Sequence, residues 1–375
     1  MAPLDGFVQS EERQMSQKRP LVLWFDECDE NSLPLVGGKN MSLGRMTRAE
    51  IPVPPGFAVT THAYEDLLSE AGIGQKIMDT MAKVDPEDVA TVQEAGKTVR
   101  ELIRGAPVPA HVEPVIKDAY QGLCDRCSLA AMPVAVRSSA TAEDLPGASF
   151  AGQQETYLWV MGANEVVEAT RNCWASLFTD RAISYRLKMG FPHEQVLISV
   201  GVQKMVNAKC AGVLFTLNPL TGDRSKITID ANWGLGESVV RGEVTPDNYL
   251  VDKVTFNIGR RTISPKTVEY IVDRQTGQVV QCEVPEGRQQ EPCLTDEEIL
   301  ELTRLAKDIE KYYDGKPQDI EWAVDRDLPF PENILILQSR PETVWSEKEV
   351  KPIVEPGKSV LDTILDATMK GKKLK

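Results

Sequence analysis

The pattern of hydrophobic positions divides the chain into a helix-rich first part and a strand-rich second part. Short apolar runs at 21–25 (LVLWF) and 133–136 (PVAV) predict buried strands. Between them, amphipathic stretches from about residue 61 to 125 predict several helices packed on one lobe. The stretch 51–60 contains three prolines and a glycine, so it predicts an extended connection and not a helix.

The second part of the chain changes character after one more helical stretch. Residues 163–190 predict a single long helix, with Asn164 capping its start and Gly190 its end. From about residue 196 to 280, short β-rich runs alternate with Gly, Asn, Pro and Asp, which predicts a sheet-based second lobe. A further helix is expected at 295–313, because Thr295 and Glu298 form the pattern of a capping box.

Two final strands carry a candidate chemical site. In DIEWAVD, Glu321 shares a face with Ala323, and in ILILQSR, Gln338 and Arg340 share a face with Ile336, because strand side chains alternate. If the strands pair, Glu321, Gln338 and Arg340 converge. A carboxylate and an amide oxygen suit Mg²⁺, and an arginine suits a phosphoryl group. The alternative is a salt bridge on an exposed edge strand.

The stretch RSSATAEDLPGASFAGQQ follows the apolar run at 133–136 and predicts a phosphate-binding loop. Arg137 is expected at a strand end, where a parallel or mixed sheet presents groups to ligands. The small residues after it allow backbone N–H groups to approach an anion closely. A plain linker is the alternative, but it explains the arginine and the small residues less well.

Two glycine-containing motifs resemble known phosphate motifs but do not match them. In GGKN, Leu33 stands where a P-loop needs its first glycine, and Asn40 stands where it needs Ser or Thr. In GLGESV, Val239 replaces the last glycine of a dinucleotide-binding fingerprint. What remains is Lys39, flanked by glycine, which either carries a positive charge to a phosphate or is a solvated turn lysine.

Composition limits the class of protein. The chain has 375 residues and a formal net charge of -14, which opposes nonspecific binding to nucleic acid or to an anionic membrane. A polar start and no apolar segment near the roughly 18 residues of a membrane span predict a soluble, cytoplasmic protein. The seven cysteines are scattered and predict free thiols, although Cys124 and Cys127 leave a redox or metal role open.

Several motifs together resemble one family, the phosphoenolpyruvate synthase and pyruvate phosphate dikinase family, which also includes rifampicin phosphotransferase. The resemblance covers roughly residues 20 to 345 in the family's order. It rests on LVGGKNMSLGRM, IPVPPGFAVT, VAVRSSATAEDLPGASFAGQQETYL, QKMVNAKCAGVLFTLNP, GLGESVVRGEVTPDNY, DIEWAVD and LQSRP.

This resemblance implies an α+β protein with an ATP-grasp fold, in which two lobes enclose the nucleotide. The implied division is a flexible arm at 1–20, a first lobe at 21–195, a second lobe at 196–345 and a tail at 346–375. In the tail, SVLDTILDATM has the pattern of a docking helix. The loop DRDLPFPEN is longer than the family's usual tight connection, which puts the geometry of the last hairpin in question.

The resemblance also implies a role for individual residues, with ATP and Mg²⁺ as ligands. Glu321 and Gln338 would bind Mg²⁺, and Arg340 would face the transferring phosphoryl group. The remaining expected contacts with the nucleotide are Lys39 and Arg137 at the phosphates, Gly152 and Thr156 in the loop over them, Gln203, Lys204, Met205 and Val206 along the adenine, and Glu237 in the nucleotide pocket.

The family's reaction passes the β,γ-phosphates of ATP to a histidine and releases AMP. In full-length relatives a swivelling domain carries that histidine, and none of His62, His111 and His193 lies in a comparable loop. We therefore expect a separate subunit to carry the histidine and the acceptor site. A split arrangement of this kind resembles phenylphosphate synthase, which phosphorylates phenol. The alternatives are another phosphoenolpyruvate synthase-like or antibiotic phosphotransferase system, and a non-catalytic nucleotide-sensing subunit.

Overall fold

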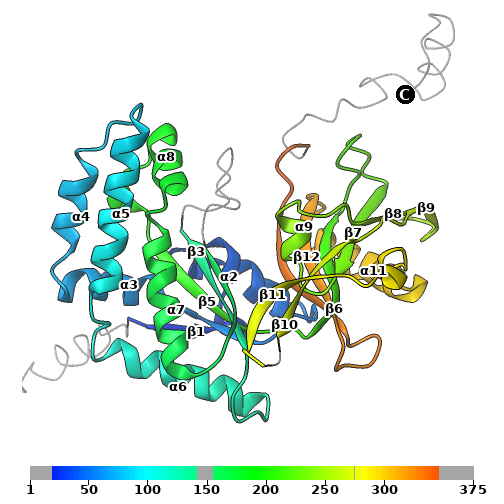
Figure 1. Cartoon of the computed structure of the whole chain (residues 1–375), viewed down its shortest axis with the longest axis horizontal. Coiled ribbons are helices and arrows are strands. Elements are labelled where there is room, and N and C mark those ends of the chain that lie inside the picture. The colour runs from blue at the N-terminus through cyan, green and yellow to red at the C-terminus, as the bar shows by residue number, and fades with distance from the viewer. Residues whose placement is uncertain (1–18, 142–154, 274, 346–375) are drawn as a thin grey trace, which may run out of the picture.

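The computed structural model describes residues 19–141, 155–273 and 275–345. It shows two lobes, each with its own sheet (Figure 1), and all paired strands within the sheets are antiparallel. Helices and sheets are both extensive, which confirms the predicted α+β class. Within these ranges no helix combines the length and the apolar character needed to cross a membrane.

The first lobe is built on a five-stranded sheet with the order β1-β2-β5-β3-β4. The apolar run at 21–25 forms the edge strand β1, and the end of the proline-rich stretch pairs with it, so both predictions are confirmed. The strands are β1 (Val22–Trp24), β2 (Gly56–Val59), β3 (Val134–Ala140), β4 (Thr156–Val160) and β5 (Ile198–Lys204).

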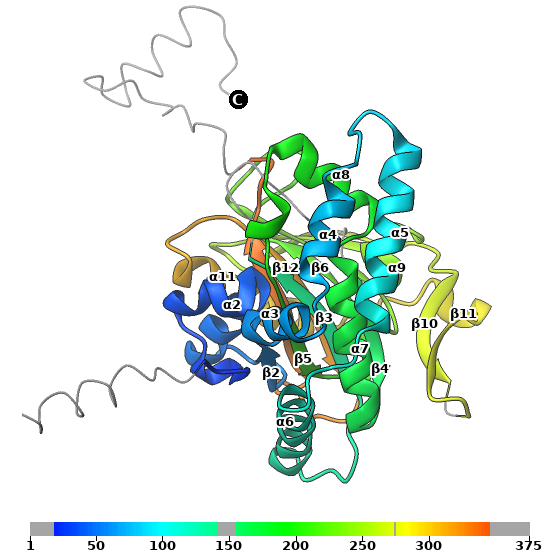
Figure 2. The same cartoon turned by 90° about the vertical axis from the view of Figure 1, so that its left-hand side faces the viewer.

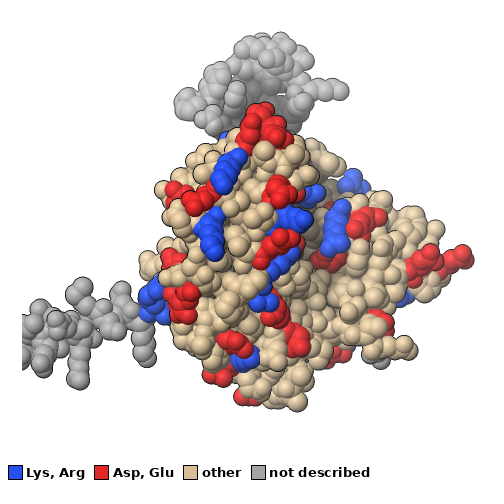
Figure 3. All heavy atoms as spheres, turned by 60° about the vertical axis from the view of Figure 1, so that its left-hand side comes forward, with Lys and Arg blue, Asp and Glu red and all other residues tan. Residues whose placement is uncertain are grey.

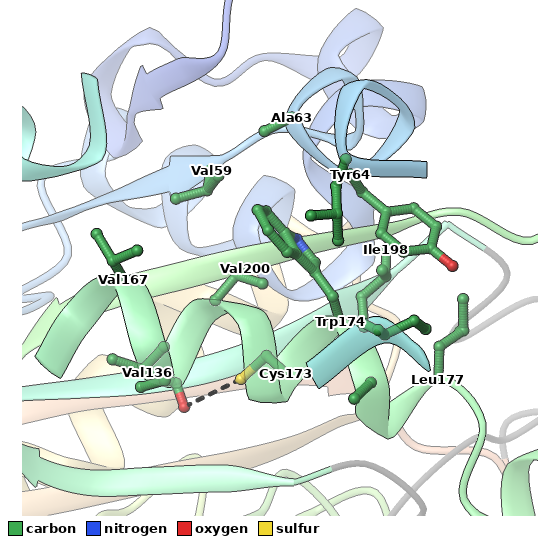
Figure 4. Close-up of a cluster of buried hydrophobic side chains, with 14 of the residues drawn as sticks. Val59, Ala63, Tyr64, Val136, Val167, Cys173, Trp174, Leu177, Ile198 and Val200 are labelled. Carbon is green, nitrogen blue, oxygen red and sulfur yellow. Dashed lines mark hydrogen bonds between the residues drawn. The ribbon is translucent and has the colours of Figure 1, made fainter. Parts of the chain in front are cut away.

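Helices pack against this first sheet and against one another, as Figures 1 and 2 show from two sides. They are α2 (Leu33–Arg48), α3 (Thr61–Glu70), α4 (Gly74–Met81), α5 (Val89–Gly105), α6 (Val112–Arg126), α7 (Ala163–Ser176) and α8 (Asp180–Met189). Short 3₁₀ turns η1 (Phe25–Glu27), η2 (Glu30–Ser32) and η3 (His193–Gln195) complete the lobe. Figure 4 shows Trp174 of α7 and Tyr64 of α3 in the buried core of this lobe, where their ring centroids lie 6.3 Å apart.

The single helix predicted at 163–190 is two helices, which corrects that prediction. The chain turns at Leu177–Thr179, and the hydroxyl of Thr179 accepts a hydrogen bond from the backbone N–H of Ala182 to start α8. Asn164 caps nothing, because Gly162 occupies the N-cap position of α7 without a side-chain bond. Gly190 ends α8 in the left-handed conformation at φ 69°, as predicted.

The second lobe is built on a six-stranded sheet with the order β13-β12-β6-β7-β8-β9 and a separate hairpin, β10-β11. Its strands are β6 (Ala208–Phe215), β7 (Lys226–Trp233), β8 (Asp247–Asp252), β9 (Ile258–Thr262), β10 (Val268–Asp273), β11 (Gln278–Glu283), β12 (Gln318–Asp325) and β13 (Ile334–Pro341). Its helices are α9 (Glu237–Val240), α10 (Glu286–Gln289) and α11 (Asp296–Tyr312). α11 begins at the predicted capping box of Thr295 and Glu298.

One strand lies in a different sheet from the one that the sequence suggests. Residues 196–204 are expected in the second lobe, but β5 is the central strand of the first sheet, between β2 and β3. The chain changes sheet after Lys204 and enters β6 at Ala208. The segment between these two residues is therefore the point at which the backbone passes from one lobe to the other.

Candidate active site

A cleft of about 880 Å³ lies between the two lobes, with β3, β4 and β5 on one side and β6, β12 and β13 on the other. Every predicted site residue within the described ranges lines it, whereas Gly152 lies outside those ranges. These residues are Lys39, Arg137, Thr156, Gln203, Lys204, Met205, Val206, Glu237, Glu321, Gln338 and Arg340. The structure thus brings them together, and the role of each stays a prediction.

The hairpin of β12 and β13 places two candidate metal ligands directly opposite each other. Glu321 pairs with Gln338 in the strand register, and Trp322 pairs with Ile336, so Leu337 is an extra residue in β13. This β-bulge reverses the alternation, because one inserted residue moves the following side chains to the other face. Ile336 therefore packs in the core of the second lobe and does not share a face with Gln338, which corrects the predicted face assignment.

Arg137 lies in the middle of β3 and not at a strand end, because β3 extends to Ala140. Its sheet is antiparallel, so the expected position at the end of a parallel or mixed sheet is wrong. The guanidinium reaches across the cleft, where Nη2 donates to Glu321 Oε2 at 2.6 Å and Nη1 donates to the carbonyl oxygen of Leu337 at 3.2 Å. Arg137 thereby connects the two lobes directly.

Lys39 enters the cleft because α2 is kinked just before it. Gly37 has φ 70° and ψ 171°, outside the helical region, and a Cβ there would lie 2.4 Å from the carbonyl oxygen of Ser139 in β3. Only glycine permits both this backbone conformation and this close approach. The Lys39 Nζ then donates to the carbonyl oxygen of Ser138 at 3.3 Å, on the cleft side of β3.

Arg340 is held from within its own hairpin. Asp319 stands opposite it in the strand register, and Asp319 Oδ2 accepts bonds from Arg340 Nε at 2.9 Å and from Nη2 at 2.6 Å. Sequence reasoning missed Asp319 as a site residue. The strand alternation does place it on the same face as Glu321, two residues away, so the signal was present.

The two carboxylates of this hairpin have pKa values that move in opposite directions. Burial raises the pKa of Asp319, and this effect outweighs that of Arg340. Burial also raises the pKa of Glu321, but the positive charges of Arg137, Lys39 and Arg340 lower it by more, so the net pKa is below its usual value. Glu321 therefore stays ionised, as a metal ligand must be.

The end of the cleft expected to hold the adenine is formed by the segment between the lobes. The Nε2 of Gln203 donates to the carbonyl oxygen of Pro54 at 3.3 Å. The backbone N–H groups of Lys204 and Met205 donate to the carbonyl oxygens of Pro55 and Pro133, each at 2.9 Å. These two N–H groups are therefore committed to the fold, and apolar side chains of this segment provide the surface that a base would contact.

The cleft is cationic although the whole chain is acidic. Of the described residues that line it, six are Lys or Arg and three are Glu, whereas the chain carries a net charge of -14. Figure 3 shows acidic and basic side chains interspersed over one outer face of the molecule. A polyanion is thus attracted to the cleft locally, against the overall charge of the protein.

Comparison with known proteins identifies the family. A family model described as "Pyruvate phosphate dikinase, AMP/ATP-binding domain" matches residues 33–359. The chain belongs to this family. Membership supports ATP as the ligand of the cleft.

Curated relatives of the pyruvate phosphate dikinase family match most of this chain. They include the "Probable phosphoenolpyruvate synthase" of Staphylothermus marinus, 45% identical over 360 residues, which cover 90% of this chain and 43% of the relative. The "Phosphoenolpyruvate synthase" of Pyrococcus furiosus is 44% identical, and the match covers 87% of this chain and 44% of the relative. The "Phosphoenolpyruvate synthase" of Synechocystis is 44% identical, and the match covers 89% of this chain and 43% of the relative. The chain spans less than half the length of these relatives.

Two further arginines of this dikinase-family cleft were not expected from the sequence. Arg181 projects from the start of α8, and Arg241 follows α9 in the opposite lobe. Arg241 forms an ion pair of 2.9 Å with Glu237, one of the predicted pocket residues. Arg241 lies within the motif GLGESVVRGEVTPDNY, which was a signal that sequence reasoning did not use, whereas no local motif surrounds Arg181.

Proposed function

We propose that this chain is the ATP-binding catalytic part of a dikinase-type phosphotransferase with an ATP-grasp fold, in which the two lobes enclose the nucleotide. The observation that carries the proposal is the meeting of Lys39 and Arg137 from the first lobe with Glu321, Gln338 and Arg340 from the second in one cationic cleft. A polyphosphate chain between the lobes is the ligand that such a charge distribution favours.

The proposed reaction is the transfer of the β- and γ-phosphates of ATP to a histidine. A histidine nitrogen attacks the β-phosphorus, the bond from this phosphorus to the oxygen that bridges it to the α-phosphate breaks, and AMP leaves with that oxygen. Water then cleaves the histidine-bound diphosphate, which releases the γ-phosphate as inorganic phosphate and leaves one phosphoryl group on the histidine for the acceptor. Arg137 and Lys39 hold the phosphates from one side, and Arg340 neutralises the charge that develops during transfer. Preoriented cations of this kind contribute more in a cleft than in open water.

The residues present fit a magnesium ion that arrives with the nucleotide. The described residues contain no group of three or more His, Cys, Asp or Glu side chains suited to a metal. Glu321 and Gln338 offer two oxygen ligands on one hairpin, and Mg²⁺ commonly combines one or two protein oxygens with substrate phosphates. The ion would supply charge neutralisation at the β- and γ-phosphates.

We further propose that a partner supplies the histidine, in a separate subunit. The described residues that line the cleft include none of the chain's three histidines. His111 lies beside Asp66 and Glu70, and His193 accepts a hydrogen bond from Arg186, so both are engaged elsewhere in the first lobe. His62 lies 3.3 Å from the carbonyl oxygen of Pro20.

For the final acceptor, the relatives favour pyruvate over phenol. Those reported above carry the name phosphoenolpyruvate synthase, which supports pyruvate as the molecule that receives the phosphoryl group. They give no support to the phenol acceptor of a phenylphosphate synthase, nor to an antibiotic acceptor. Both remain alternatives that differ in the partner and not in this ATP-binding part.

The decisive experiment supplies the acceptor histidine in trans. The purified chain is mixed with the part of the Pyrococcus furiosus phosphoenolpyruvate synthase that lies outside the matched region, together with Mg²⁺ and ATP labelled in the β-phosphate. We expect AMP and label on a histidine of the added polypeptide. ADP without AMP contradicts the proposal, and tight ATP binding without turnover, with the added polypeptide shown to be folded, indicates a nucleotide-sensing subunit instead.

A further inference from the structure

The residue after the cleft lysine is buried and bonded to both neighbouring strands. Asn40 is 2% exposed, and its Nδ2 donates to the carbonyl oxygen of Val36 at 3.0 Å and to Ser199 Oγ of β5 at 3.2 Å. Its backbone N–H donates to Ser139 Oγ of β3 at 3.4 Å. The bond to Val36 spans the kink at Gly37, so one amide side chain closes the kink and attaches it to the first sheet.

The sheet has a matching space for this side chain. Gly201 lies in the middle of β5, and a Cβ there would lie 2.3 Å from Asn40 Oδ1. Any larger residue at position 201 would therefore displace the amide, since non-bonded heavy atoms do not approach so closely. The absence of a side chain at Gly37 lets the kink approach β3, and its absence at Gly201 leaves space on β5 for the Asn40 amide. The two glycines thus permit a single arrangement of the kink and of Asn40.

Two residues further along, the same helix is attached to the second lobe. Ser42 is 7% exposed, and its Oγ donates to the carbonyl oxygen of Ser339 in β13 at 2.7 Å. Ser339 lies between Gln338 and Arg340, which both line the cleft. Tyr313, just after α11, also meets the Ser42 hydroxyl at 2.7 Å.

We propose that Asn40 and Ser42 are positioning residues, which together fix Lys39 relative to both walls of the cleft. The Asn40 side chain holds the kink before Lys39 against β5, which pairs with the Arg137 strand β3, and Ser42 holds the same helix against the end of β13. The segment from 39 to 42 is then a bridge that holds the cations of the two lobes at the spacing of a polyphosphate chain. This inference rests on the proposed ATP-binding function.

The test separates a positioning role from a merely structural one by comparing two nucleotides. Asn40→Asp keeps the size and shape of the side chain but replaces the Nδ2 donor with an oxygen. This oxygen then faces the carbonyl oxygen of Val36, and the hydrogen bond is lost. We expect ATP to bind about tenfold more weakly, equivalent to about 1.4 kcal/mol, while AMP affinity stays within about twofold. Isothermal titration with each nucleotide gives the ratio of ATP affinity to AMP affinity. Asn164→Asp, at an exposed position on α7, is the matched control.

A double-mutant cycle links the effect to Lys39. In a Lys39→Met background, Asn40→Asp should change ATP affinity no further, because the group that it positions is gone. An equal loss of ATP and AMP affinity in Asn40→Asp, or a further loss of ATP affinity in the Lys39→Met background, would overturn the inference.

Ser42→Ala keeps the inference testable if Asn40→Asp does not fold. It removes one hydroxyl and should also lower the ratio of ATP to AMP affinity, by about threefold, since one hydrogen bond is lost. An unchanged ratio in a folded Ser42→Ala protein contradicts the proposal. If the wild-type chain itself binds no ATP, the proposed function fails, which is a distinct result from unaltered ratios in a wild type that binds.

Discussion

Two arginines of the cleft each meet a carboxylate, but the two pairs join different parts of the molecule. Arg137 and Glu321 form an ion pair of 2.6 Å between β3 of one lobe and β12 of the other. Arg340 and Asp319 form a pair of 2.6 Å within a single hairpin. The first pair depends on how the lobes sit, whereas the second is intact in any arrangement of the lobes.

We propose that this difference reflects a division of labour between the two arginines. A guanidinium oriented within one hairpin needs no rearrangement before it acts, which suits the group that stabilises charge during transfer. A guanidinium that pairs between the lobes must release its carboxylate before it can bind a phosphate. This property suits a residue that couples ATP binding to the relative position of the two lobes. Loss of the first should therefore affect turnover, and loss of the second should affect binding and stability.

The largest expected effect is that of Arg340→Ala. We expect the rate of AMP formation with the acceptor polypeptide to fall roughly 10³-fold, because a cation facing a transferring phosphoryl group contributes on this scale. ATP affinity should change far less. AMP formation and titration of ATP measure the two quantities separately.

Arg304→Ala is the matched control, because Arg304 also pairs with carboxylates but lies exposed on α11. It should leave both quantities unchanged. If Arg340→Ala instead weakens ATP binding as much as it slows AMP formation, then Arg340 holds the ground state, and the contrast with Arg137 disappears.

A smaller effect is expected for Arg137→Met. The variant leaves Glu321 without its nearest cation in a cleft where the carboxylate side chain is 26% exposed. We expect a loss of about 2 kcal/mol in the free energy of unfolding, between the values for exposed and for fully buried pairs, because water reaches this pair. ATP should bind about tenfold more weakly, since one charge-assisted phosphate contact is lost.

Urea unfolding and ATP titration test this variant, and Arg100→Met provides the comparison. Arg100 pairs with Asp180 between α5 and α8, within the first lobe and outside the cleft. Its loss should lower stability without changing ATP affinity. Unaltered stability in Arg137→Met would show that the ion pair between the lobes contributes little.

The smallest effect concerns pH and distinguishes the two carboxylates. The pKa of Glu321 is lowered in the folded protein, so its contribution to stability is present above its unfolded pKa of about 4.5 and is lost as the pH falls below it. The pKa of Asp319 is raised, so ionising it costs stability as the pH rises above about 3.8. Glu321→Gln should therefore be less stable than wild type at pH 6, and this deficit should shrink as the pH falls.

Asp319→Asn should show the opposite trend, with its stability relative to wild type rising from pH 4 to pH 6. Urea unfolding across this range measures both variants on one scale. If the stability of both variants relative to wild type changed with pH in the same direction, the two carboxylates would have equivalent surroundings. That result would contradict the structure.

Part of the site was predictable, because strand alternation places Gln338 and Arg340 on one face of β13 and Glu321 faces the same site from the paired strand. Glu321, Gln338 and Arg340 converge as periodicity predicts, and the long loop before β13 does not prevent the hairpin. The bulge at Leu337 was not predictable, because a run of Ile and Leu fits either register equally well. Only the pairing with Trp322 shows that Ile336 faces the core of the second lobe, whereas Leu337 lines the cleft.

The errors in the fold have a similar origin. The break between α7 and α8 falls in an apolar stretch with no glycine or proline, so periodicity alone continued the helix through Leu177. β5 reads as a buried strand, but a buried strand has the same pattern in either sheet, and its place between β2 and β3 depends on contacts distant in sequence. Local pattern specifies the element and not its neighbours.

The ion pair of Arg137 with Glu321 also bears on the order in which ligands arrive. While Arg137 is paired with Glu321, a dissolved divalent ion must displace a guanidinium that lies 2.6 Å from the carboxylate and belongs to the same chain. A nucleotide that already carries its metal brings a replacement partner for each member of the pair at once: phosphate for the arginine and metal for the glutamate. With Glu321 as the proposed metal ligand, the pair would favour simultaneous entry of metal and nucleotide over preloading with metal.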